Sequence, residues 1–255
     1  MATTYLHAAN EILQELNEVE LTSSNFASAV GIHQFVKSII NRAYRDIVNA
    51  EKEWPFLSAG THEEPFLGSE YVESVAGQRW YLLKTGATDT RDDYSSVDWD
   101  SFYLTDFGVA GATEPYENRN LPFSSIDQWI KYHRENDNDA HLTTGSESGV
   151  PQRVMVSADG RSFGLSPIPD AVYRIYFSAW NQPTELTSYS SEFVFADRWM
   201  PVLYARARYY MWQFKESPQQ AAFALNEYKE GLSFMRNTLI DPTPDNMLDD
   251  RARFI

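Results

Sequence analysis

The sequence predicts an α+β protein: an antiparallel helical bundle, built from both ends of the chain, that carries an inserted antiparallel β domain. Two observations predict this class. Apolar residues recur at helical spacing near both ends of the 255-residue chain, and short β-branched and aromatic runs separated by Gly, Pro, Asp and Asn fill its middle. We expect a bundle over residues 1–55 and 190–240, a β sandwich or barrel over 56–189, and an extended C-terminal arm over 241–255.

Two helices are predicted in the N-terminal segment. The first has an apolar stripe from Leu6 to Leu16, at steps of three and four residues. The second has an unbroken apolar face from Ile32 to Val48, with charged side chains off that face. We expect the second helix to continue to Pro55, because a proline pushes the residue before it out of the helical region.

The middle of the chain has the pattern of short strands joined by turns. Its clearest hairpin is RVMVS–ADG–RSFGL, where Asp159 and Gly160 supply the positive φ angles of a tight turn. The run VYRIYFSAW predicts a further strand, and SSIDQWIKYHR predicts one helix capped by Ser125. Residues 85–96 and 134–149 are expected to be exposed loops.

Two more helices are expected after the β domain. The first is predicted from Glu192 onward, with a start or a kink at Pro201, and its apolar residues at nearly every turn indicate burial on more than one side. The second opens at Pro218, a residue favoured at the first helical position. Its apolar stripe consists of Ala221, Ala222, Leu225, Tyr228, Leu232 and Met235.

Composition and charge exclude several classes of function. Without cysteine, the chain has no disulfide, thiol nucleophile or cysteine-ligated metal. No run approaches the roughly 18 apolar residues of a membrane span, so we expect no membrane partner. A formal charge of −15 argues against wrapped nucleic acid, since phosphate binding requires Lys and Arg. Most of the excess falls in residues 60–150, which hold 17 acidic and 6 basic side chains.

The search for catalytic chemistry finds no nucleotide-binding, metalloprotease or serine-hydrolase motif, and we predict no catalytic residue, cofactor or metal site. Paired carboxylates leave one alternative open: a carbohydrate-binding or glycan-cleaving β domain on a helical base. Catalysis of that kind needs two carboxyl groups about 5–9 Å apart. The candidate pairs are Glu63 with Glu64, Asp92 with Asp93, Asp98 with Asp100, and Asp137 with Asp139.

Aromatic residues are abundant, with 7 Trp, 15 Tyr and 15 Phe. Core packing accounts for most of them, and we expect the remainder to face a partner subunit, since protein interfaces favour aromatic residues and Arg. One helical stretch has that composition and supplies the candidate subunit interface: Arg206, Arg208, Tyr209, Tyr210 and Trp212.

Two stretches resemble a known family. The opening YLHAANEILQELNEVELTSS, followed by a long helix ending in NAEKEWPF, is similar to the start of phage tail tubular protein A and related head-to-tail adaptors. The stretch GVPQRVMVSADGRSFGLSPIPDAVYRIYFSAWNQPTELT resembles a pattern of phage connector proteins. It carries Gly149, Pro151, Leu165, Pro167, Pro169, Asp170, Tyr173 and Pro183. Residues 60–147 are not covered by the resemblance.

The resemblance implies a structural virion protein without enzymatic activity. Such adaptors form a ring, typically a dodecamer, between the portal protein and the tail nozzle protein of short-tailed phages. The ring is assembled in the host cytoplasm and lets DNA pass without sequence-specific binding. The resemblance also implies a C-terminal arm that reaches the portal, for which the candidate anchors are Leu248, Arg251, Arg253, Phe254 and Ile255.

The resemblance leaves two questions open. Another connector, such as a head-completion or tail-terminator protein, would have the same sequence features. The acidic block over 60–150 fits a channel that repels DNA phosphates, and it fits equally a surface charge that serves solubility alone.

Overall fold

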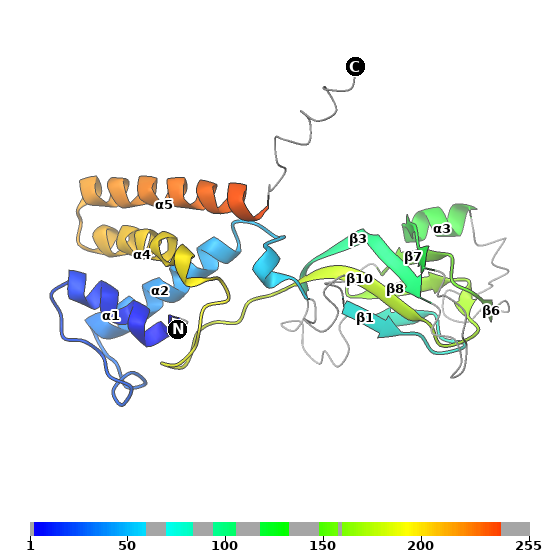
Figure 1. The fold of residues 1–255 in the computed structure, drawn as a ribbon, viewed down its shortest axis with the longest axis horizontal. Coiled ribbons are helices and arrows are strands. Elements are labelled where there is room, and N and C mark those ends of the chain that lie inside the picture. Colours follow the sequence, from blue (N-terminus) through cyan, green and yellow to red (C-terminus); the bar gives the residue numbers. More distant parts are fainter. Residues whose placement is uncertain are drawn as a thin grey trace, which may run out of the picture. The chain divides into compact units, whose positions relative to one another are not determined.

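Two compact units make up the described part of the chain in the computed structural model (Figure 1). The structure describes residues 3–59, 70–83, 94–105, 118–132, 148–157 and 160–240. One unit is helical and contains the described residues up to Phe56 and from Pro183 onward. The other is the β unit, which contains the described residues between Leu57 and Gln182. The protein is therefore α+β, with helices from both ends of the chain.

The helical unit is arranged around its third long helix, α4. Its α-helices are α1 (Tyr5–Glu15), α2 (Ile32–Val48), α4 (Met200–Phe214) and α5 (Pro218–Leu239). Helix α4 lies between α5 and α2 and also contacts α1 (Figure 1). A helix with neighbours on several sides needs apolar residues around most of its circumference, as the sequence of α4 indicates. Its buried residues are Met200, Val202, Leu203, Ala205, Ala207, Tyr210 and Met211.

Helix α2 has the predicted apolar face but ends before the predicted stop. Its last residue is Val48, and Asn49 caps it by donating its backbone amide to the carbonyl of Arg45. The buried Trp54 then returns to the helix end and donates its indole N–H to the carbonyl of Ile47 at 3.0 Å. The prediction that the helix reaches Pro55 was therefore wrong. The apolar periodicity itself stops at Val48, and Pro55 begins a short 3-10 turn, η1 (Pro55–Leu57).

The return into the helical unit is irregular where a helix was predicted. Phe193 and Phe195 are buried and Val194 between them is exposed, which is the period of a strand. Both rings contact the ring of Tyr44, with centroids 5.6 and 5.9 Å away. A 3-10 turn, η3 (Asp197–Trp199), precedes α4, and Pro201 lies in the first turn of that helix, so this proline starts the helix and does not kink it.

In the β unit, two four-stranded sheets enclose one core. The first sheet has the order β1 (Glu70–Glu73), β10 (Arg174–Asn181), β3 (Tyr94–Thr105), β4 (Asn118–Asn120). The second has the order β2 (Trp80–Leu82), β8 (Ser162–Ser166), β7 (Arg153–Val156), β5 (Phe123–Ser124). A third pair joins β6 (Ser148–Gly149) to β9 (Ile168–Pro169). The β5–β7 and β6–β9 pairs are parallel, and the other described pairs are antiparallel.

Aromatic rings from both sheets fill this core, which makes the unit a sandwich. Phe102 stacks on Phe177 with ring centroids 4.9 Å apart, and both contact Phe163 of the opposite sheet. Each of these three side chains is fully buried. Among the residues that the structure describes, sixteen Phe, Tyr and Trp side chains are buried, so core packing accounts for many of the aromatic residues.

Local predictions in the β unit met different outcomes. The hairpin formed by β7 and β8 is confirmed, with Gly160 at φ +70°. Helix α3 (Ile126–Tyr132) is also confirmed, because the Ser125 hydroxyl accepts the amide of Gln128 as the predicted cap. The two loops were predicted too long: Tyr94–Ser96 pair with β10, and Ser148–Gly149 pair with β9. Residues 85–93 and 134–147 lie outside the described residues.

Two asparagine side chains hold loop backbone against helices in the helical unit. Asn41 of α2 donates to the carbonyl of Leu186 at 2.9 Å and accepts the amide of the same residue at 3.2 Å. Asn10 of α1 makes the same pair of bonds with Leu21, at 3.0 and 2.9 Å. Each side-chain amide thus satisfies both the N–H and the carbonyl of one loop residue, as a neighbouring β-strand would. The Asn41 pair fixes the chain where it returns from the β unit.

Candidate interaction surface

Arg206, one of the predicted subunit contacts, makes several contacts within the chain. Its Nε donates to Oδ2 of Asp46 on α2 at 2.6 Å, and its Nη2 donates to the Tyr210 hydroxyl at 2.9 Å. The guanidinium also lies over the ring of Tyr228 on α5, 4.9 Å from its centroid. Arg206 therefore joins α2, α4 and α5. Charge-assisted bonds of this kind contribute about 1.5–3 kcal/mol each.

Tyr210 completes the same cluster and is 6% exposed. Its hydroxyl donates to Oδ2 of Asp46, the oxygen that Arg206 also contacts, and the guanidinium of Arg42 lies 4.1 Å from its ring centroid. Burial, together with the hydrogen bond to Asp46, raises the pKa of the Tyr210 hydroxyl. Burial lowers the pKa of Arg206, but its contacts with Asp46 outweigh this, so the net pKa is raised. The Tyr210 hydroxyl therefore stays protonated and donates its hydrogen bond to Asp46.

Arg208 makes a second link inside the unit. It binds Glu15 of α1 bidentately, with Nε donating to Oε2 at 3.0 Å and Nη2 donating to Oε1 at 2.6 Å. Its Nη1 lies 3.6 Å from Glu227 of α5. The hydrogen bonds to Glu15 raise the pKa of the Arg208 guanidinium. Three of the five predicted interface residues thus join helices of one chain.

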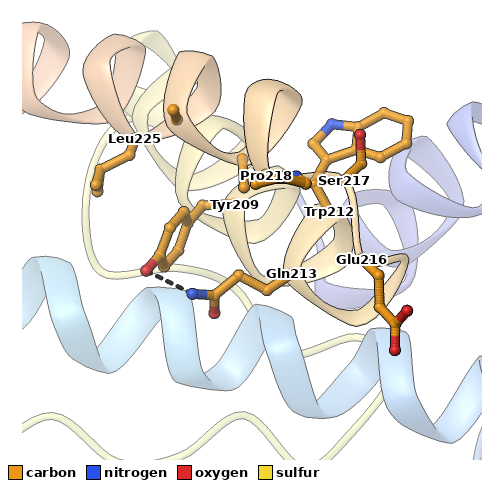
Figure 2. Close-up of a pocket in the computed structure, with 9 residues that line it drawn as sticks. Tyr209, Trp212, Gln213, Glu216, Ser217, Pro218 and Leu225 are labelled. Carbon is orange, nitrogen blue, oxygen red and sulfur yellow. Dashed lines mark hydrogen bonds between the residues drawn. The ribbon is translucent and has the colours of Figure 1, made fainter.

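The other two predicted residues, Tyr209 and Trp212, line a groove at the turn between α4 and α5 (Figure 2). The groove has a volume of about 490 Å³. Tyr209 is held in place by Gln213, whose Nε2 donates to the tyrosine hydroxyl at 2.7 Å. The remaining lining residues come from the turn and the start of α5: Glu216, Ser217, Pro218, Ala221, Ala222 and Leu225.

The turn that shapes this groove is a Schellman motif. The amide of Glu216 donates to the carbonyl of Gln213 at 3.2 Å, and the amide of Ser217 donates to that of Trp212 at 3.0 Å. Glu216 occupies the left-handed position, with φ +54°. A side chain there costs about 1–2 kcal/mol relative to glycine, because its Cβ crowds the backbone. Pro218 then opens α5 in the first helical turn.

Exposed phenylalanines are the functional candidates that the sequence prediction missed. Phe223 is 74% exposed and Phe234 is 66% exposed, both on α5, and Phe214 at the end of α4 is 60% exposed. The signal was present in the sequence, since Phe223 and Phe234 stand off the apolar stripe of α5 at a spacing of eleven residues, three helical turns. Ala222, predicted within the stripe, is exposed, and Ala224 is buried in its place.

The β unit offers little support for a sugar site among its described residues. Asp98 and Asp100 are exposed, and Oδ1 of Asp98 accepts the backbone amide of Asp100 at 3.0 Å. On the outer face of the first sheet, the ring of Tyr176 is covered by Tyr71 and Tyr103, with centroids 5.5 and 5.1 Å away. A sugar needs an open ring face, and the central ring of this row, that of Tyr176, is only 4% exposed. The other three carboxylate pairs lie outside the described residues.

Three further kinds of candidate are a metal site, a membrane-spanning helix and the C-terminal arm. In the described ranges, no group of three His, Asp or Glu side chains is arranged to hold a metal ion. None of the helices described is long and apolar enough to cross a membrane. The candidate arm residues Leu248, Arg251, Arg253, Phe254 and Ile255 lie outside the described part of the chain.

Comparison with known proteins identifies the family. No curated protein matches the chain. The family model described as SU10 adaptor protein matches residues 3–247, which includes both units. An adaptor of this family is a structural component of the phage virion and associates with portal and tail proteins. With nearly its whole length matched, the chain belongs to the SU10 adaptor protein family, a family of phage head-to-tail adaptors.

Proposed function

We propose that this adaptor is the subunit of a ring, a dodecamer, that joins the portal protein to the tail nozzle protein and encloses the DNA channel. The match of the adaptor model over residues 3–247 carries this proposal. The exposed phenylalanines of the helical unit are compatible with it, because protein interfaces are enriched in aromatic side chains. We place the assembly of the ring in the host cytoplasm.

Electron microscopy of negatively stained protein tests the ring directly. The purified chain is imaged alone and after mixing with the portal protein of the same phage. We expect closed rings in at least the second sample, with one diameter and one subunit number. Protein that stays monomeric in both samples, by light scattering as well as by imaging, contradicts the proposed ring.

The subunit contact is proposed to include Tyr209 and Trp212, which line the open groove. Arg206, Arg208 and Tyr210 are assigned a different role, because their polar groups are already bonded to Asp46 and Glu15. Substitution of Trp212 by Ala is expected to lower the oligomer fraction at a given concentration. Sedimentation velocity measures that fraction, and an unchanged distribution argues against the groove as a contact.

The last ten residues are proposed to anchor the adaptor to the portal through Leu248, Arg251, Arg253, Phe254 and Ile255. These residues combine apolar side chains with two arginines, a composition that suits protein contacts. A chain truncated after Asp245 should retain the helical signal of the full chain and lose affinity for immobilised portal protein. Equal portal binding by the two chains would show that the anchor lies elsewhere.

The acidic residues of 60–150 are proposed to face the channel and to keep DNA from adhering. Like charges repel DNA phosphates, and a ring repeats the net charge of this block in every subunit. Exposed Asp98 and Asp100 are the described acids of the middle of strand β3. A density map of the assembled ring tests the idea, and acids placed wholly on the outer rim would refute it.

A further inference from the structure

Helix α5 carries two exposed phenylalanines on one side, of which Phe234 also contacts the ring of Trp199. Phe223 and Phe234 are eleven residues apart, which at about 100° per residue places them roughly 20° apart on the helix surface. Both are more than 60% exposed, at 74% and 66%. Together they leave on the order of 200–350 Å² of aromatic surface in water. Between them the face carries Glu227 and Glu230, so the apolar surface lies in two separate projections.

The groove lies on nearly the opposite side of the same helix. Its α5 lining consists of Pro218, Ala221, Ala222 and Leu225, whose mean direction is about 160° from that of the two phenylalanines. Phe223 is also at the height of the groove, because its position in the chain falls inside the lining range 218–225. The exposed ring of Phe223 and the aromatic-lined groove thus lie at the same height along α5, on two different faces of the helix.

We propose that Phe223 of one copy inserts into the groove of the next copy, against Tyr209 and Trp212. This inference rests on the proposed ring and names its subunit contact. A contact between two different faces is heterologous, and it repeats from copy to copy. With the α5 helices of neighbouring copies parallel, a projection and a hollow at one height make each step mainly a rotation about an axis parallel to this helix. A step without rise closes into a ring, whereas a step with rise builds a filament.

The dimensions support a second copy as the occupant. A groove of about 490 Å³ accommodates an aromatic side chain and leaves room for its neighbours. A stable interface buries about 800 Å² on each partner, so the two phenylalanines would form the apolar centre and the polar face around them the rim. The groove residues Tyr209 and Trp212 also belong to the subunit interface predicted from the sequence.

Two surface variants test the contact by complementation. Phe223→Ser removes the projection and leaves the groove intact, and Ala222→Trp fills the groove and leaves the projection intact. Both positions are exposed, so the fold should be retained, which circular dichroism checks. Ala27→Trp, at an exposed site remote in sequence from the groove, is the matched control for added bulk. Native mass spectrometry, with portal protein added if the wild type requires it, reports the subunit number.

Each single variant should lose the ring, with the dissociation constant of the neighbour contact raised by on the order of 30-fold. A mixture of the two variants should form a one-to-one dimer that stops there, because one intact projection meets one intact groove. A chain with both substitutions should not pair with Phe223→Ser. Rings formed by either single variant, or no dimer in the mixture, overturn the inference and leave the proposed ring standing. A wild type that stays monomeric with portal protein overturns both.

Discussion

Replacing Arg206 by methionine distinguishes a clamp within the chain from a contact between subunits. The variant removes the bond to Asp46 at 2.6 Å, the bond to Tyr210 at 2.9 Å, and the charge over the ring of Tyr228. The first contributes about 1.5–3 kcal/mol, the second about 1 kcal/mol, and the third about 0.5–1 kcal/mol. Methionine retains the packing of the aliphatic stem, and the side chain of Asp46 is 29% exposed, so water partly compensates. We expect the free energy of unfolding to fall by about 3 kcal/mol.

Urea titration followed by circular dichroism at 222 nm measures this loss, because the signal reports the helical unit. Asp46→Asn and the double variant complete a double-mutant cycle, in which the Arg206–Asp46 coupling should be about 1–2 kcal/mol. Trp180→Phe in the β unit serves as a control that leaves the cluster untouched. A loss below about 0.5 kcal/mol, together with a lower oligomer fraction, would refute the intrachain clamp and restore Arg206 as a subunit contact.

Three further predictions concern stability. Glu216→Gly should raise the free energy of unfolding by about 1 kcal/mol, since glycine has no penalty at the left-handed position of the turn, and a urea midpoint that falls would argue against this. Asn41→Ala should lower it by about 2 kcal/mol, because the backbone amide and carbonyl of Leu186 lose their partners, and thermal unfolding checks the shift. Burial raises the pKa of the Tyr44 hydroxyl from 10 to about 12. The neutral hydroxyl therefore contributes fully to the free energy of unfolding below pH 10, and roughly 2–3 kcal/mol is lost as the pH rises to 12. Tyr44→Phe should flatten the alkaline limb of a stability–pH profile, and an unchanged limb would contradict that assignment.

Periodic elements were predictable from the sequence because their signal is local. The apolar face of Ile32–Val48 coincides with α2, and the Ser125 cap coincides with the start of α3. The buried pair Phe193 and Phe195 was misassigned, since a two-residue alternation of only three positions was taken as the start of the following helix.

The interaction surface was less predictable because it depends on contacts between distant residues. Arg206 meets Asp46 across 160 positions of sequence, and composition alone does not predict this internal pair. The groove needs the turn after α4 and the start of α5 in their folded arrangement. The exposure of Phe223 and Phe234 was predictable from the sequence, because both are apolar residues on the polar side of an amphipathic helix.

The hydrogen bonds between Asn41 of α2 and the backbone of Leu186 have a consequence for folding during synthesis. They join positions 145 residues apart, with the whole β unit between them. At about 5–20 residues per second, the ribosome needs roughly 7–29 s to make these 145 residues. Through that interval α1 and α2 have emerged, but the helix that covers their apolar faces has not been made. The nascent helical pair must therefore remain soluble while half of its core is missing, which makes this early stage the one at which aggregation competes with folding.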